Sequence, residues 1–142
     1  EMCIRDSPPP NPRIAAWWRE LNRVADGMND FDLSLETTHH GPWIETPSLF
    51  IEIGSTAETW GHKEAAKVLA GIIYRGLGLD GGEGLGEWRG EGQVVVTLGG
   101  GHYAPRGNLL ASHEDVWIGH MLATYALPVT RDEDENISGE SS

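Results

Sequence analysis

The chain has 142 residues, of which 39% are hydrophobic, and a formal net charge of −12. This length is most simply one domain with one core, and no apolar run approaches the ~20 residues that span a bilayer. The acidic balance lacks the basic surface of a general nucleic-acid binder, so we expect no DNA or membrane partner and binding of RNA only at a local site.

Cysteine content and the first residues predict the compartment. Cys3 is the single cysteine, which excludes an internal disulfide framework, and no secretory signal pattern is present at the start. We therefore expect a reducing, cytoplasmic environment. We also expect the protein to be a monomer.

Residues 1–10 are expected to lie outside the fold as a non-native or disordered leader. The run Met2 to Ser7 resembles translated adapter sequence, and three prolines follow it. Asn11 and Pro12 are then typical of an N-cap and the first residue of a helix. The helix is predicted from apolar residues at steps of three and four: Ile14, Trp17, Trp18, Leu21, Val24, Ala25 and Met28. The tryptophan pair could stack on nucleobases, but packing against a sheet is favoured.

Two strands are predicted next. Residues 31–38 alternate between apolar and polar side chains and run into His39 and His40, before Pro42 stops the strand. Residues 47–53 also alternate, with Glu52 as an anomaly, since a carboxylate in an apolar strand needs a donor or a cation. Glu52 is therefore either paired with a neighbouring donor or part of a site.

A helix and a long connection lead to a third strand. Ser55 and Glu58 form a capping box that predicts a helix closing near residues 76–78. Its inward face is predicted from the apolar positions Ala65, Val68, Leu69, Ile72 and Ile73. Residues 80–92 are rich in glycine and indicate a connection, so the strand at 94–98 would be reached by a parallel crossover.

The third strand ends in chemistry-bearing residues. Residues 94–98 indicate a buried strand, and Gly99, Gly100 and Gly101 then leave backbone N–H groups uncovered for an anion or oxyanion. His102 is a candidate base or metal ligand, Tyr103 offers a hydroxyl and a stacking face, and Arg106 suits phosphate. The alternative is a glycine-rich turn that carries a surface histidine.

The rest of the chain gives weaker signals. Residues 107–115 are polar and predict irregular structure or one helical turn, and residues 116–127 are apolar and fit either a helix or a strand. Residues 129–142 are predicted to form an acidic disordered tail. The predicted organisation is thus a leader at 1–10, an α/β domain at 11–128 and a tail at 129–142.

Polar clusters follow all three predicted strands. The carboxyl ends of parallel strands share one edge of a sheet, so we expect an α/β fold, mainly a parallel sheet flanked by helices, with a site at that edge. The residues expected to converge are His39, His40, Glu52, His102 and His120. Imidazoles with a carboxylate suit zinc, although no HExxH or CxxC spacing occurs. Adjacent strand residues face opposite ways, so His39 and His40 share a metal only if the turn breaks the pleat. His62 and His113 are expected to be solvated.

Four motifs in order carry a family resemblance. They are residues 38–42 (THHGP), 47–55 (PSLFIEIGS), 99–106 (GGGHYAPR) and 119–122 (GHML). Together they resemble the archaeal and plant type of D-aminoacyl-tRNA deacylase over about Phe31 to Leu127. The resemblance implies hydrolysis of the ester that joins a D-amino acid to tRNA, a zinc-associated enzyme, and a fold similar to peptidyl-tRNA hydrolases and nucleoside phosphorylases. Family members are longer on both sides, which implies that this chain is a central fragment.

The resemblance and the residues together suggest roles for the site. His39, His40 and His102 would bind metal or activate water, Glu52 would be a ligand or base, and His120 would be a ligand or support one. Gly99, Gly100 and Gly101 would hold the oxyanion, with Tyr103 and Arg106 binding substrate and its terminal phosphates. Two alternatives stay open: a nucleoside phosphorylase-like transferase, which would need phosphate, and a zinc-stabilised RNA-binding module without catalysis.

Overall fold

The computed structural model describes residues 8–38, 44–54, 56–127, 129–131 and 137–139. The elements in chain order are α1 (Ile14–Val24), α2 (Ala57–Trp60), α3 (Lys63–Gly76), β1 (Gln93–Leu98), α4 (Pro105–Ala111), β2 (Val116–Leu122), the 3-10 turn η2 (Thr124–Ala126), β3 (Val129–Arg131) and β4 (Ile137–Gly139). Helices combined with a parallel strand pair make an α/β fold, as the sequence predicts. The similarity to peptidyl-tRNA hydrolase and nucleoside phosphorylase folds stays a prediction.

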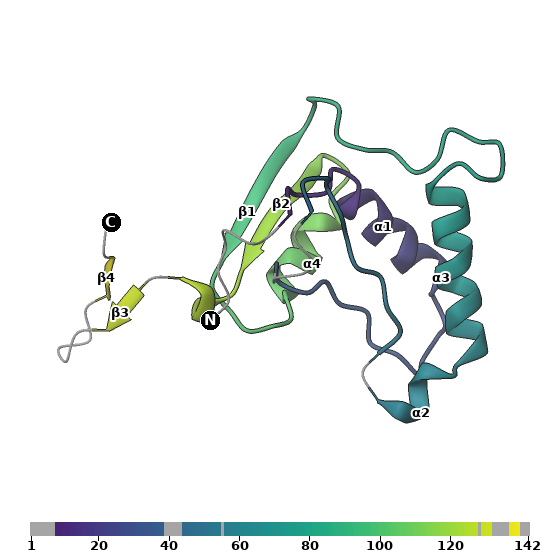
Figure 1. Ribbon diagram of the computed structural model, residues 1–142, viewed down its shortest axis with the longest axis horizontal. Coiled ribbons are helices and arrows are strands. Elements are labelled where there is room, and N and C mark those ends of the chain that lie inside the picture. Colours follow the sequence, from purple (N-terminus) through teal and green to yellow (C-terminus); the bar gives the residue numbers. More distant parts are fainter. Residues whose placement is uncertain (1–7, 39–43, 55, 128, 132–136, 140–142) are drawn as a thin grey trace.

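The core lies between the strand pair and two helices (Figure 1). β1 and β2 run parallel and are joined through α4, while α1 packs on both α4 and β2. α3 packs on α1 and forms an outer layer (Figure 1). The buried cluster consists of Ala15, Trp18, Ala104, Ala111, Ile118 and Met121.

α1 begins two residues later than its predicted first residue, Pro12. The predicted cap at Asn11 is wrong, since the N-cap residue is Arg13, which makes no side-chain capping bond. Oδ1 of Asn11 instead accepts the N–H of Arg13 at 2.9 Å. Trp18 is 5% exposed and belongs to the core, and Trp17 is 8% exposed. The Trp17 ring lies so close to α3 that a Cβ on Gly76 would meet its Cζ2 atom at 2.5 Å. Trp18 therefore packs with strand residues of the core, as predicted, whereas Trp17 packs on α3.

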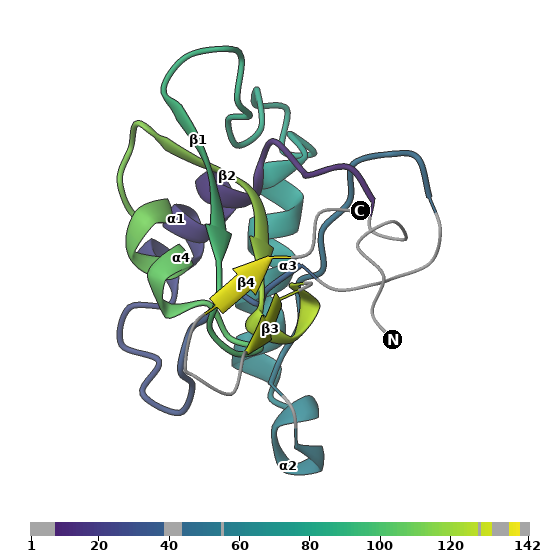
Figure 2. The ribbon, with the colours of Figure 1, turned by 90° about the vertical axis from the view of Figure 1, so that its left-hand side faces the viewer.

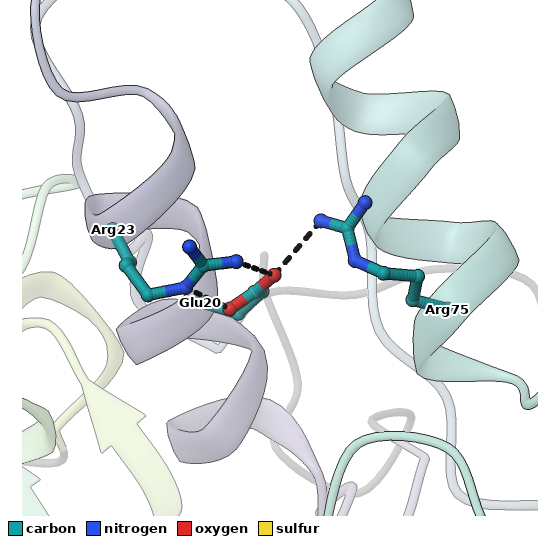
Figure 3. Close-up of polar contacts among 3 residues, drawn as sticks. All are labelled: Glu20, Arg23 and Arg75. Carbon is teal, nitrogen blue, oxygen red and sulfur yellow. Dashed lines mark hydrogen bonds and ion pairs between the residues drawn. The ribbon is translucent and has the colours of Figure 1, made fainter. Parts of the chain in front are cut away.

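Glu20 ties α1 to α3 (Figure 3). One carboxylate oxygen lies 2.7 Å from Nη2 of Arg23 and 2.8 Å from Nη2 of Arg75, and the other accepts from Nε of Arg23 at 2.8 Å. The Glu20 side chain is only 11% exposed, so this three-residue cluster replaces the water that the carboxylate loses.

The single helix predicted after residue 54 is wrong, since the structure divides it into α2 and α3. Thr56 caps α2 and exchanges capping interactions with Thr59, whereas Ser55 of the predicted capping box lies outside the described residues. His62 then caps α3 by accepting the Ala65 N–H through Nδ1 at 3.2 Å. His62 has an extended backbone, so a helix cannot continue through it. The first amides of α3 lack acceptors within the helix, and the His62 side chain supplies one of them. Figure 2 shows α2 projecting beyond the end of α3.

Two of the three predicted strands are wrong. Residues 31–38 form a single bridge, Glu36 with Tyr103, and residues 47–53 have no ladder partner in the described part of the chain. The side chains of both segments nevertheless alternate between half-buried and exposed, as predicted. The half-buried ones are Leu33, Leu35, Ile51 and Ile53, and the exposed ones are Asp32, Ser34, Phe50 and Glu52. Alternation thus reports which side chains face the protein, but a strand also needs a neighbouring backbone to bond with.

β1 exists as predicted, but it is not buried on both faces. Val94, Val96 and Leu98 are 49%, 56% and 59% exposed, while Val95 packs against the core. The connection at 80–92 is irregular, as expected. Residues 107–115 were expected to contain at most one helical turn, but residues 105–111 form α4, with Pro105 at its first turn.

The ambiguous run at 116–127 is a strand followed by η2. Val116 and Ile118 of β2 face the core, and the register shifts between the pairs Val95–Ile118 and Thr97–Met121. Two residues, Gly119 and His120, therefore stand opposite the single residue Val96, which is a β-bulge. Without the bulge, His120 would follow Ile118 into the core; with it, Met121 takes that place.

β3 and β4 pair antiparallel in a segment expected to be a disordered tail, and they lie away from the other elements (Figure 1). The division of the chain at residues 10 and 128 stays a prediction. Of the helices in the described part, none combines the length and apolarity that a bilayer crossing requires.

Candidate functional site around the glycine loop

The glycine loop after β1 is held against the end of β2. Gly99 and Gly100 have φ angles of +96° and +86°, in the left-handed region that favours glycine. The Gly99 N–H donates to the Leu122 carbonyl at 2.8 Å, and the Gly100 carbonyl accepts from the Thr124 N–H at 3.0 Å. The amides of Gly100 and Gly101 make no hydrogen bond with a residue that the structure describes. The loop therefore presents two backbone donors to an anionic group, and the amide of Gly99 is occupied.

His102 contacts a carboxylate that the sequence did not single out. Its Nε2 lies 3.2 Å from Oε1 of Glu36, with the two side chains 48% and 29% exposed. The Tyr103 ring meets the His102 ring edge-on at 5.3 Å between centroids. The backbone of Glu36 also bridges to Tyr103, so one short segment holds both residues of the loop.

His120 stands on the bulge of β2 and contacts the neighbouring part of that segment. Its Nδ1 lies 3.2 Å from Oγ1 of Thr38, which also accepts the N–H of Met121 at 3.1 Å. Burial lowers the pKa of the His120 imidazole from its usual 6.5, so the ring is neutral at pH 7. A neutral imidazole carries one N–H donor and one lone pair, both of which are useful in acyl transfer.

A groove of about 900 Å³ runs past Glu36, Thr38 and His120, but its lining does not include His102 or the glycine loop. Its lining includes Glu36, Thr38, Glu52, Tyr103 and His120. Glu52 is exposed, so burial does not require it to have a donor or a cation, and its role as a ligand or base stays a prediction. Glu52 and His120 nevertheless both line the groove.

The described residues do not by themselves form a zinc site. No three His, Cys, Asp or Glu side chains among them are grouped so that they could hold a metal ion. His39 and His40 lie outside the described residues, and the prediction that they are ligands or catalytic groups stays a prediction. His62, expected to be solvated, caps α3 and packs edge-on against Phe31, while His113 is exposed.

The two side chains predicted to bind substrate, Tyr103 and Arg106, lie after the glycine loop and at the start of α4. Tyr103 is 54% exposed, and Arg106 is exposed in the first turn of α4. Sequence reasoning missed Glu36 and Thr38. The alternation over residues 31–38 carried a signal for them, because it places both on one side of the segment that precedes His39.

Comparisons with known proteins identify the family. The family model described as D-aminoacyl-tRNA deacylase matches residues 5–139. The chain belongs to the D-aminoacyl-tRNA deacylase family. The match includes parts of the segments 1–10 and 129–142, which the predicted division places outside the deacylase-like domain.

Individual members of the deacylase family agree with this match. A D-aminoacyl-tRNA deacylase from Arabidopsis thaliana is 44% identical over 126 residues, covering 84% of this chain and 40% of that protein. One from Pyrococcus horikoshii is 46% identical over 108 residues, covering 74% and 38%. A crystal structure described as a conserved protein of unknown function superposes with a TM-score of 0.68 at 34% identity, covering 84% of this chain and 40% of that one. The chain thus spans about two fifths of the length of these relatives.

Proposed function

We propose that this chain carries part of a centre that hydrolyses the ester between a D-amino acid and the 3′ end of tRNA. The observation that carries the proposal is the placement of His102 and His120. One segment holds both residues: Thr37 bonds to the backbone carbonyl of His102, and Thr38 contacts the ring of His120, which lines a groove of about 900 Å³. Membership of the deacylase family supports the choice of ester and substrate.

The chemistry is acyl transfer to water. His102 accepts a proton from water while the water oxygen bonds to the ester carbonyl carbon. The N–H groups of Gly100 and Gly101 donate to the oxyanion of the tetrahedral intermediate, which would contribute about 3 kcal/mol per well-placed donor. Breakage of the carbon–oxygen bond then releases the free D-amino acid and the tRNA hydroxyl, which takes up the proton that His102 accepted from water.

Zinc binding is a separate proposal, and it depends on His39 and His40. The described residues do not supply a set of three ligands, so we assign no catalytic step to a metal. The proposal predicts that the purified chain retains zinc, measured by elemental analysis, and that the double substitution of His39 and His40 by alanine abolishes retention. Equal zinc content in both proteins would remove these residues as ligands.

The biological setting follows from the substrate. Hydrolysis of D-aminoacyl-tRNA returns tRNA for correct charging, which would make this a chirality-proofreading step of translation quality control in the cytoplasm. The chain is acidic, so tRNA would be held locally, with Arg106 next to the terminal phosphates. Monomeric state and absence of DNA binding stay predictions.

The test is incubation of the chain with D-Tyr-tRNA and L-Tyr-tRNA. We expect release of D-tyrosine, little release of L-tyrosine, and no requirement for phosphate. His102→Ala and His120→Ala should each lower the rate at least tenfold, whereas His113→Ala, an exposed histidine away from the groove lining, should not. Full activity of both site variants would contradict the proposal, and phosphate-dependent turnover or tRNA binding without cleavage would favour the two alternatives.

A further inference from the structure

The segment Leu35–Thr38, called here the 35–38 segment, is bonded to both histidine-bearing parts of the chain. The Leu35 carbonyl accepts the Ala104 N–H at 2.9 Å, and the Thr37 N–H donates to the His102 carbonyl at 2.8 Å. One residue further on, the Thr38 N–H donates to the Met121 carbonyl at 2.6 Å. These backbone bonds fix the segment relative to the glycine loop and to β2.

The side chains of the segment alternate in direction. Thr37 is 3% exposed and faces the protein, and its Oγ1 donates to the His102 carbonyl at 3.0 Å. Glu36 and Thr38, two residues apart, belong to the other side of the segment. All three residues line the groove. Glu36 contacts Nε2 of His102 and Thr38 contacts Nδ1 of His120, each at 3.2 Å. One face of one segment therefore holds two imidazoles from distant parts of the sequence.

We propose that Glu36 and Thr38 are positioning residues that fix the orientation and tautomer of His102 and His120. The catalytic purpose of these contacts rests on the proposed function, whereas the contacts themselves do not depend on that function. A carboxylate is an acceptor only, so Glu36 selects the ring form of His102 with the proton on Nε2 and the lone pair on Nδ1.

Thr38 selects the same ring form at His120, but through the other ring nitrogen. Its hydroxyl oxygen accepts the Met121 N–H, and in the proposed arrangement its own proton is donated to Nδ1 of His120. The proton of that neutral ring then sits on Nε2. Both imidazoles would thus carry the proton on Nε2 and the lone pair on Nδ1. Nδ1 of His102 would accept a proton from water, and the Nε2–H of His120 would donate a hydrogen bond to an ester oxygen.

The bulge in β2 makes this arrangement possible. Gly119 and His120 share the position opposite Val96, and Met121 fills the core position that strict alternation would give to His120. Bulges re-aim side chains in this way next to active sites. The same device leaves the Met121 N–H available to the Thr38 hydroxyl.

The first test is NMR of the ring nitrogens in the intact 142-residue chain, using imidazole ¹⁵N chemical shifts to assign tautomers. We expect the Nε2–H form at both His102 and His120. Glu36→Ala should shift the His102 nitrogens and Thr38→Val those of His120, while Glu36→Gln and Thr38→Ser, which retain an acceptor and a hydroxyl, should restore the original pattern. Thr37→Val is the matched control, because the Thr37 hydroxyl contacts a backbone carbonyl and neither ring.

The second test is hydrolysis of D-Tyr-tRNA by the same variants. Groups that hold a working histidine typically contribute roughly 10- to 100-fold to activity. We expect a loss in this range in kcat for Glu36→Ala and Thr38→Val, with KM little changed and partial recovery in Glu36→Gln and Thr38→Ser. Glu83→Gln, which removes a distant exposed carboxylate, controls for the change in net charge.

The two proposals fail in different ways. If the unsubstituted chain hydrolyses no D-aminoacyl-tRNA, the proposed function fails, and the ring-nitrogen shifts still decide the positioning roles. If Glu36→Ala and Thr38→Val fold, as judged by circular dichroism, and leave both rings unchanged, the positioning roles are wrong whatever the activity. A shift that appears equally in Thr37→Val would also overturn them, because it would report a general disturbance of the segment.

Discussion

Trp17 and Trp18 are neighbours in α1 with different hydrogen bonding. The indole N–H of Trp18 donates to the Asn108 carbonyl at 3.1 Å and to the Ser112 hydroxyl at 3.2 Å. The buried indole N–H of Trp17 has no acceptor among the residues that the structure describes. An unsatisfied buried donor is costly, whereas a satisfied one contributes a net stabilisation.

Substitution of each tryptophan by phenylalanine separates these two situations. Both changes remove a similar volume, so their difference reports the indole N–H. We expect Trp18→Phe to lower the free energy of unfolding by about 1–2 kcal/mol more than Trp17→Phe, measured by urea denaturation followed by circular dichroism. Equal losses would show that the Trp17 N–H is satisfied in solution.

Gly100 and Gly101 offer a matched pair for the glycine loop. A Cβ at either position would meet no atom within 4 Å, but only Gly100 has a positive φ, +86°. Gly100→Ala should therefore destabilise the protein by about 1–2 kcal/mol, the cost of a left-handed non-glycine residue, and Gly101→Ala should not. The measurement is the shift of the urea midpoint, and similar shifts for the two variants would contradict the loop conformation.

At the scale of elements, Glu20 links α1 to α3 and makes their packing depend on pH. The hydrogen bond from Arg23, followed by that from Arg75, lowers the pKa of the Glu20 carboxyl below its usual 4.5, against the opposite effect of burial. A carboxyl with a lower pKa in the folded state stabilises the fold above its unfolded pKa. That contribution is lost as the pH falls from about 4.5 through the folded value.

The prediction is a difference between two glutamate variants. Glu20→Gln should cost roughly 1–2 kcal/mol at pH 7, between the values for exposed and buried ion pairs, and the gap from the parent chain should close as the pH falls below 4.5. Glu64→Gln removes an exposed pair with Lys67 within α3 and should have little effect. Urea denaturation across this pH range measures both, and a gap that stays constant with pH would refute the assignment.

The elements also show how far sequence patterns reach. α1, α3 and β1 were predictable because periodicity and turn residues are local properties of the chain. The failure at 31–38 and 47–53 has one cause: alternation records a half-buried extended segment, but not whether another strand lies alongside. The break at His62 was missed because a histidine is rarely considered as a helix cap.

The site was predictable in its parts and not in its connections. The glycine run marked the loop, and His102 and His120 were both candidates. Glu36 and Thr38 were missed because their contacts are with residues far away in the sequence. Thr38 and His120, for example, are separated by 82 residues. The bulge at His120 could not be predicted either, because the register of β2 depends on its partner strand, β1.

At the scale of the whole molecule, one face of the strand pair stays open. Val94, Val96 and Leu98 of β1 are each about half exposed, and β1 pairs only with β2 among the described strands. Exposed apolar faces on edge strands favour association with further chains. This face therefore offers a direct test of the monomeric state that the sequence predicts.

Any self-association of the 142-residue chain that appears as its concentration rises should occur through this face, so Val96→Lys should reduce it. Lysine at an edge strand opposes pairing, and Val96 is 56% exposed, so its replacement should leave the core intact. Leu109→Lys is the matched control, because Leu109 is 72% exposed on α4, away from the open face. Sedimentation velocity over a concentration series measures the effect. Association that persists in Val96→Lys, or that Leu109→Lys reduces equally, would mean that β1 is not the surface through which the copies meet.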